Sequence, residues 1–121
     1  MKKYFMFIFI LTLVANIQAQ TRYFQAYQVQ FYDGNFNLIE TSSCDKVIKV
    51  SDTDHTLIIS GSLAFYFYGS VRTETAGVFS QMATPNDGSG NCRIFMAYTS
   101  STSTRFTIRW TNMSVAYTCR N

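Results

Sequence analysis

The amino-acid sequence predicts an all-β protein: a small antiparallel meander of eight or nine strands that closes into an up-and-down barrel. Apolar and polar residues alternate over several short segments, which is the period-2 pattern of half-buried strands. Phenylalanine and tyrosine are abundant and the chain has one proline, a composition that favours strands. Short connections favour antiparallel pairing of consecutive strands, and so a barrel over the competing two-sheet sandwich.

Residues 1–19 are expected to be a bacterial signal peptide that is removed, which leaves a single β domain over residues 20–121. Lys2 and Lys3 form a basic start, residues 4–14 are almost wholly apolar, and Ala19 is a small residue suited to cleavage. The apolar run is too short to cross a bilayer comfortably. We therefore expect a secreted or periplasmic protein with no membrane association after cleavage.

The domain begins with a predicted strand over residues 23–32. Its alternation places four apolar side chains on one face, those of Tyr23, Tyr27, Val29 and Phe31. Asp33-Gly34-Asn35 is a strong turn signal. Residues 36–41 then predict a short edge strand.

The middle of the chain predicts a hairpin between residues 47–50 and 57–60. This register pairs apolar residues with each other, Val50 with Leu57 and Ile48 with Ile59. Residues 63–68 continue the sheet with Leu63 opposite Ile59 and Phe65 opposite Leu57. Residues 78–83 form a further strand, and the turn-rich segment 84–91 is the longest loop.

The C-terminal region from Cys92 to Arg120 predicts three strands. A two-residue turn at Thr111 and Asn112 pairs apolar partners throughout: Trp110 with Met113, Ile108 with Val115, and Phe106 with Tyr117. In the preceding hairpin, a pairing of Tyr98 with Phe106 would also set Phe95 opposite Arg109.

Three cysteines in an exported chain make one disulfide plausible. In a meander, Cys92 begins one strand and Cys119 ends the strand two places later, so these two lie at opposite ends of the sheet. A disulfide requires Cα atoms within about 7 Å. Counting strand reversals places Cys44 at the same end as Cys92, which predicts a Cys44–Cys92 disulfide with Cys119 free.

Charge and motifs exclude several classes of chemistry. Removal of Lys2 and Lys3 lowers the formal net charge from +3 to +1, which offers no electrostatic basis for binding nucleic acid. Asp52 and Asp54 precede the single histidine, His55, but a polar hairpin tip explains this cluster better than a metal site. We therefore predict no metal, no cofactor and no catalytic residues, and we lean against an enzyme.

The candidate binding residues are Tyr66, Tyr68, Phe95 and Arg109, which oppose the core-facing stripe of their strands. Exposed aromatic rings beside guanidinium groups suit a binding surface for a protein, peptide or glycan. The leading interpretation is thus a small exported β domain that binds an unknown partner of this kind without catalysis.

Three alternatives stay open. The barrel could carry a small apolar ligand near four aromatic residues of its interior, Tyr98, Phe106, Trp110 and Tyr117. The chain could be an exported hydrolase whose site is assembled from loops. It could also be an assembly subunit whose edge at residues 36–41 pairs with a neighbour.

Overall fold

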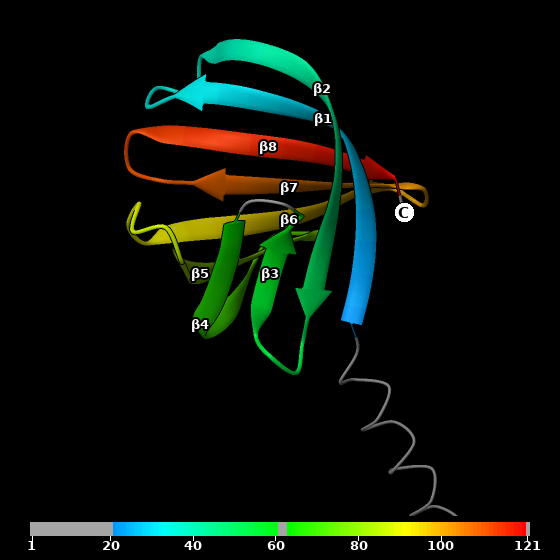
Figure 1. Cartoon of the computed structure of the whole chain (residues 1–121), viewed down its shortest axis with the longest axis vertical. Helices are drawn as coiled ribbons and strands as arrows, with labels where there is room; N and C mark the ends of the chain where they lie inside the picture. Colours follow the sequence, from blue (N-terminus) through cyan, green and yellow to red (C-terminus); the bar gives the residue numbers. More distant parts are fainter. Residues whose placement is uncertain (1–20, 61–62, 121) are drawn as a thin grey trace, which may run out of the picture.

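The structure is a computed structural model that describes residues 21–60 and 63–120, and it confirms the predicted all-β up-and-down barrel (Figure 1). Eight antiparallel strands pair in sequence order and the last pairs with the first. The expected signal peptide over residues 1–19 lies outside the described residues. The strands are β1 (Thr21–Asp33), β2 (Leu38–Ser51), β3 (Thr56–Ile59), β4 (Leu63–Thr75), β5 (Val78–Pro85), β6 (Cys92–Ser100), β7 (Ser103–Arg109) and β8 (Met113–Arg120).

The barrel interior is filled by the apolar stripes of the strands. Its most deeply buried aromatic side chains are Phe65 on β4 and Phe106 on β7. The predicted registers of three hairpins are confirmed, because Val50 pairs with Leu57, Leu57 with Phe65, and Ile108 with Val115. In these hairpins a one-residue slip would expose every apolar side chain, so the pattern alone determines the register. Among the described residues, no helix is long and apolar enough to cross a bilayer.

The prediction for the first strand was wrong at its N-terminal half. A bulge lies between Ala26 and Gln28 of β1, so the alternation of faces changes at Tyr27. Phe24 and Ala26 are buried before the bulge and Val29 is buried after it, whereas Tyr23 and Tyr27 are exposed. Residues 38–41 of the predicted edge strand and the whole predicted strand 47–50 belong to the long, continuous β2, whereas residues 36 and 37 lie in the turn before it.

The predicted pairing of β6 with β7 was also wrong, by two residues. Phe106 pairs with Met96, so Phe95 is opposite Thr107 and not opposite Arg109. The turn is tighter than predicted, since Ser100 already pairs with Ser103. A shift of two residues preserves the facing of each side chain, and Ile94 and Ile108 remain in the core.

The three cysteines lie in the described part of the chain and are free thiols, so the predicted Cys44–Cys92 disulfide is not formed. Cys44 was expected to precede the strand at residues 47–50, but it lies inside the fourteen-residue β2. Cys92 starts β6, where its thiol donates to the Ala83 carbonyl oxygen at 3.6 Å. Burial raises the pKa of Cys92 to about 11 and that of Cys119 to about 12.

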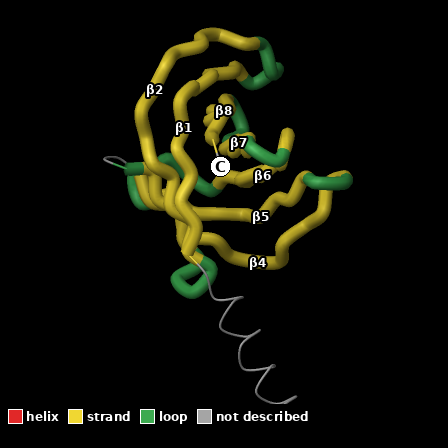
Figure 2. Tube along the Cα trace, turned by 90° about the vertical axis from the view of Figure 1, so that its right-hand side faces the viewer, coloured by secondary structure: helices red, strands yellow, loops and turns green. Residues whose placement is uncertain are grey.

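One part of the barrel wall is short. β3 has four residues, whereas its neighbours β2 and β4 have fourteen and thirteen. β3 therefore pairs only with residues 48–51 of β2 and 63–66 of β4. In Figure 2, β4 and β5 run side by side on one side of β6, and β1 and β2 curl round the other. The wall is consequently open next to the β2–β3 turn.

Candidate functional site

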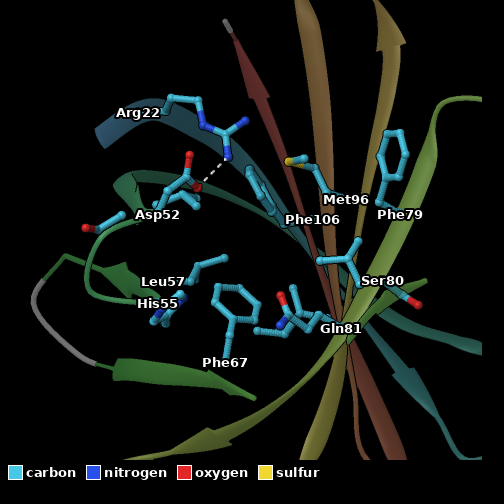
Figure 3. A pocket seen from close by; sticks show the side chains of 14 residues that line it. Arg22, Asp52, His55, Leu57, Phe67, Phe79, Ser80, Gln81, Met96 and Phe106 are labelled. Atoms are coloured by element: carbon cyan, nitrogen blue, oxygen red, sulfur yellow. Dashed lines mark hydrogen bonds and ion pairs between the residues drawn. The ribbon is translucent and has the colours of Figure 1, made fainter. Parts of the chain in front are cut away.

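A cavity of about 440 Å³ lies inside the barrel beside this short strand, at the end where β1 begins and β2 ends (Figure 3). Its walls come from β1 to β7 and the β2–β3 turn. The lining residues are Arg22, Val50, Ser51, Asp52, His55, Leu57, Phe67, Val71, Phe79, Ser80, Gln81, Ile94, Met96 and Phe106.

The body of the cavity is apolar. Leu57, Ile94 and Phe106 are buried core residues that also line it. Phe67 and Met96 are partly buried, pack against the core and border the open space, and Figure 3 shows the Phe67 ring between Leu57 and Gln81. The cavity therefore extends the hydrophobic core to a surface that a solute can reach.

An irregularity in β4 shapes the mouth. Tyr68 pairs with Met82 and Arg72 with Ser80, so three residues of β4 separate the two pairs where β5 has one. Gly69 adopts a φ of 74°, a conformation that glycine accepts readily. The Gln81 side-chain amide donates to the Gly69 carbonyl oxygen at 2.7 Å. This bulge carries Val71 to the mouth of the cavity, where it is 61% exposed.

The opposite side of the mouth is polar. Arg22 donates to the Asp52 carboxylate at 3.3 Å and to the Tyr98 hydroxyl at 3.4 Å. Both distances are long for hydrogen bonds, and the pair is substantially exposed, so the ion pair holds Arg22 only weakly. Arg22 Nε is buried and has no hydrogen-bond partner among residues 21–60 and 63–120. The guanidinium group is thus weakly held at the edge of an apolar cavity.

His55 lies at the same rim with a φ of 55°, in the β2–β3 turn. Its neighbours are engaged elsewhere: Asp52 binds Arg22, and Ser51 Oγ accepts a hydrogen bond from the Asp54 backbone N–H at 3.2 Å. Within residues 21–60 and 63–120, no group of three or more His, Cys, Asp or Glu side chains is placed to hold a metal ion. The arrangement offers a polar rim and no assembled nucleophile–base pair.

A second hollow, which we call the outer groove, lies on the outside of the barrel and has a volume of about 320 Å³. It contains two of the four predicted binding residues, Phe95 and Arg109. Its lining residues are Arg72, Met82, Asn91, Cys92, Arg93, Phe95, Arg109, Trp110 and Thr111.

The other two predicted residues border the outer groove. Tyr68 pairs with Met82, which lines it, and Tyr66 pairs with Thr84, whose hydroxyl bonds Asn91 of the groove at 3.0 Å. Tyr66 and Tyr68 are 52% and 43% exposed. β5 lies between β4 and β6 and pairs with both. The four predicted side chains therefore lie on the same outer face of three neighbouring strands and β7.

Sequence reasoning located the cavity less well. Of the four aromatic residues expected around an interior ligand, Phe106 lines the cavity and Tyr98 contacts the rim through Arg22. Trp110 and Tyr117 pack against the core elsewhere. Arg22 was missed because the predicted alternation placed Arg22 and Phe24 on the outer face, and the bulge at Tyr27 reverses that facing.

The fold and cavity define a class, a closed eight-stranded antiparallel barrel with an internal cavity open at one end. Comparison with protein families, curated proteins and solved structures finds no match to this chain.

Proposed function

We propose that this protein is a non-catalytic binding protein that holds a small, mostly apolar ligand inside its barrel. The observation that supports this is the open cavity of about 440 Å³, lined by Leu57, Phe67, Ile94, Met96 and Phe106. Sites for small molecules typically have roughly 300–1,000 Å³, a mainly apolar lining and a few polar groups that orient the ligand. An eight-stranded barrel is just wide enough to hold one such molecule.

The rim determines the ligand's polar end. A bound molecule would direct its apolar part towards Phe106 and its polar group towards Arg22 at the rim. A carboxylate would replace the long contact between Arg22 and Asp52 with a charge-assisted hydrogen bond. We therefore propose an amphiphile with a single acidic head group as the preferred ligand.

This role fits a protein that acts outside the cytoplasm, which we propose from the signal-like residues 1–19. A secreted or periplasmic carrier sequesters a poorly soluble molecule from water without a cofactor. The hydrolase alternative has less support, because neither Ser51 nor Asp52 is bonded to His55.

The test is binding of dodecanoate, followed by calorimetry, with two matched valine variants. Val71→Trp places a bulky ring at the exposed mouth and should weaken binding about tenfold or more. Val47→Trp makes the same change at a residue that is 38% exposed and does not line the cavity, and it should bind as the unaltered protein does. Equal affinities for the two variants would show that the cavity is not the site.

A second probe tests the polar end. Dodecanol has the same chain without the charge, so it should bind more weakly than dodecanoate to the unaltered protein. Arg22→Gln should remove that difference, because only the carboxylate uses the guanidinium group. Equal binding of acid and alcohol to the unaltered protein would contradict the proposed role of Arg22.

A further inference from the structure

The outer groove gathers three guanidinium groups from three different strands. Arg72 lies on β4, Arg93 on β6 and Arg109 on β7, and all three line it. The strand registers explain this: Arg93 pairs with Met82 on one side and with Arg109 on the other, and Arg72 pairs with Ser80 in the next row. The sheet itself therefore sets these cations side by side on one outward face.

Two of the three guanidinium groups have no carboxylate bonded to them among the described residues. Glu74 accepts a hydrogen bond from Ser80 and one from Arg72 at 2.7 Å, and these two contacts lower the pKa of Glu74. Arg93 donates to the neutral Ser80 hydroxyl at 2.9 Å, and Arg109 lies 4.3 Å from the centroid of the Phe36 ring. Asp87, the other nearby acid, is bonded within its own turn to Ser89.

These contacts also hold the cations in position. The hydroxyl of Ser80 is buried in a sheet position and fixes one end of Arg93. The Phe36 ring supports Arg109 from the β1–β2 turn by a cation–π contact. Guanidinium groups that are already ordered lose less entropy on binding an anion, and their planar donors match a carboxylate or sulfate.

We propose that the outer groove binds an acidic saccharide, one that carries carboxylate or sulfate groups. Arg93 and Arg109 take the acidic group, and the sugar face lies on the aromatic border formed by Phe95 and Tyr68. β5 and β6 are each paired on both sides here, so their backbone has no free edge for an extended peptide. Recognition on this face must therefore use side chains, which suits a charged ring more than a peptide strand.

The experiment titrates labelled protein with a trimer of galacturonic acid and, separately, with its neutral methyl ester. The acid should shift the amide resonances of residues 93–95 and 107–109, and the ester should not. Arg109→Gln should weaken binding about tenfold or more. Arg120→Gln is the matched control, because Arg120 is also exposed and lies 4.2 Å from an aromatic centroid, that of Tyr27, outside the groove.

The outcomes separate cleanly. Equal effects of the two arginine variants, or equal binding of acid and ester, would overturn the proposal. Tighter binding of a hexaglutamate peptide than of the trimer would contradict the saccharide proposal and indicate an acidic protein partner instead. The proposal is independent of the cavity: Val71→Trp should leave trimer binding unchanged, and dodecanoate should not displace the trimer.

Discussion

The β7–β8 hairpin and the β3–β4 wall are built from similar residues but differ in regularity. β7 and β8 pair without interruption from Ser103 with Arg120 to Arg109 with Ser114. β3 pairs with β4 over four residues, and β4 then continues past it through an irregular stretch. The regular hairpin contributes mainly to the filled core and reaches the cavity only through Phe106, whereas the irregular wall borders the cavity through Leu57, Phe67 and Val71. In this barrel, the open space lies where pairing is interrupted.

This comparison indicates that the β7–β8 hairpin mainly stabilises the fold, whereas the β3–β4 wall mainly shapes the cavity. In the regular hairpin, each inward side chain meets an apolar partner, and this burial stabilises the fold. At the irregular wall, Leu57, Ile59 and Phe65 are buried in the core, but further along β4 Phe67 is only partly buried and Val71 is exposed, and both line the cavity. Stability and ligand contact should therefore respond differently to substitution in the two regions.

The largest expected effect comes from truncating one phenylalanine in each wall. Phe106→Ala removes a ring that is 1% exposed and in contact with Phe24, so it should cost about 3–5 kcal/mol of unfolding free energy. Phe67→Ala should cost about 1–2 kcal/mol, because that ring is only partly buried whereas the Phe106 ring is almost fully buried. Urea unfolding measures the loss of unfolding free energy in both variants. Equal losses would contradict the proposed difference between the two walls.

The next effect is a loss of stability at high pH, which comes from the buried thiols. Burial raises the pKa of Cys92 from 9.0 to about 11 in the folded protein. The thiol's contribution is complete below pH 9 and is lost as the pH rises to about 11, because the unfolded state deprotonates first. The loss should reach about 3 kcal/mol.

Cys92→Ala identifies the source of this loss. The variant should unfold with a weaker dependence on pH above 9, while Cys44→Ala, at a half-buried position of β2, should keep most of it. Chemical denaturation at several pH values measures both slopes. A wild-type slope retained in Cys92→Ala would assign the loss to other groups, such as Cys119.

A smaller effect is expected at the β4 bulge. Gly69→Ala meets no atom within 4 Å, so its cost is the strain of a φ of 74°, about 1 kcal/mol. Gly88→Ala has the same geometry, with a φ of 78° and open space, but lies in the β5–β6 turn. Both should lose similar stability, and only Gly69→Ala should also change dodecanoate affinity. A change of dodecanoate affinity in both variants would show that the β4 bulge has no particular role in shaping the cavity.

The smallest effect on stability is expected at the rim. Asp52→Asn removes an exposed ion pair 3.3 Å long and should change the unfolding free energy by less than about 1 kcal/mol. The same change should strengthen dodecanoate binding, because a carboxylate no longer competes for Arg22. Calorimetry decides this, and weaker binding to Asp52→Asn would show that Asp52 itself contacts the ligand.

Much of the fold could be predicted from sequence because the apolar pattern constrains register within a hairpin. Ile48 and Val50 can face the core in only one register with Ile59 and Leu57. The bulge at Tyr27 could not be predicted, since no glycine or proline marks it and Tyr27 fits an exposed or a buried position. Once it is missed, the facing of Tyr23 is reversed.

The site residues divide in the same way. Tyr66, Tyr68, Phe95 and Arg109 were placed on the outer face by alternation alone, which survives a two-residue register error. The cavity depends on the length of β3 and on the slip in β4, and both result from pairing between strands. Alternation within one strand contains no information about such pairing. The positions of Val71 and Gln81 at the cavity mouth therefore become visible only in the folded structure.

The four-residue β3 also has a kinetic consequence. A closed barrel resists opening in proportion to the hydrogen bonds that must break along one seam. The two shortest seams join β3 to β2 and to β4, each through four residue pairs, and we consider the β3–β4 seam. Separation along this seam requires no disruption of β6, β7 or β8. The barrel can thus unzip at one line and reclose while the remaining strands stay paired. Amide hydrogens of Leu57 and Ile58 would exchange with solvent before those of Phe106 and Ile108, at the rate set by this local gate.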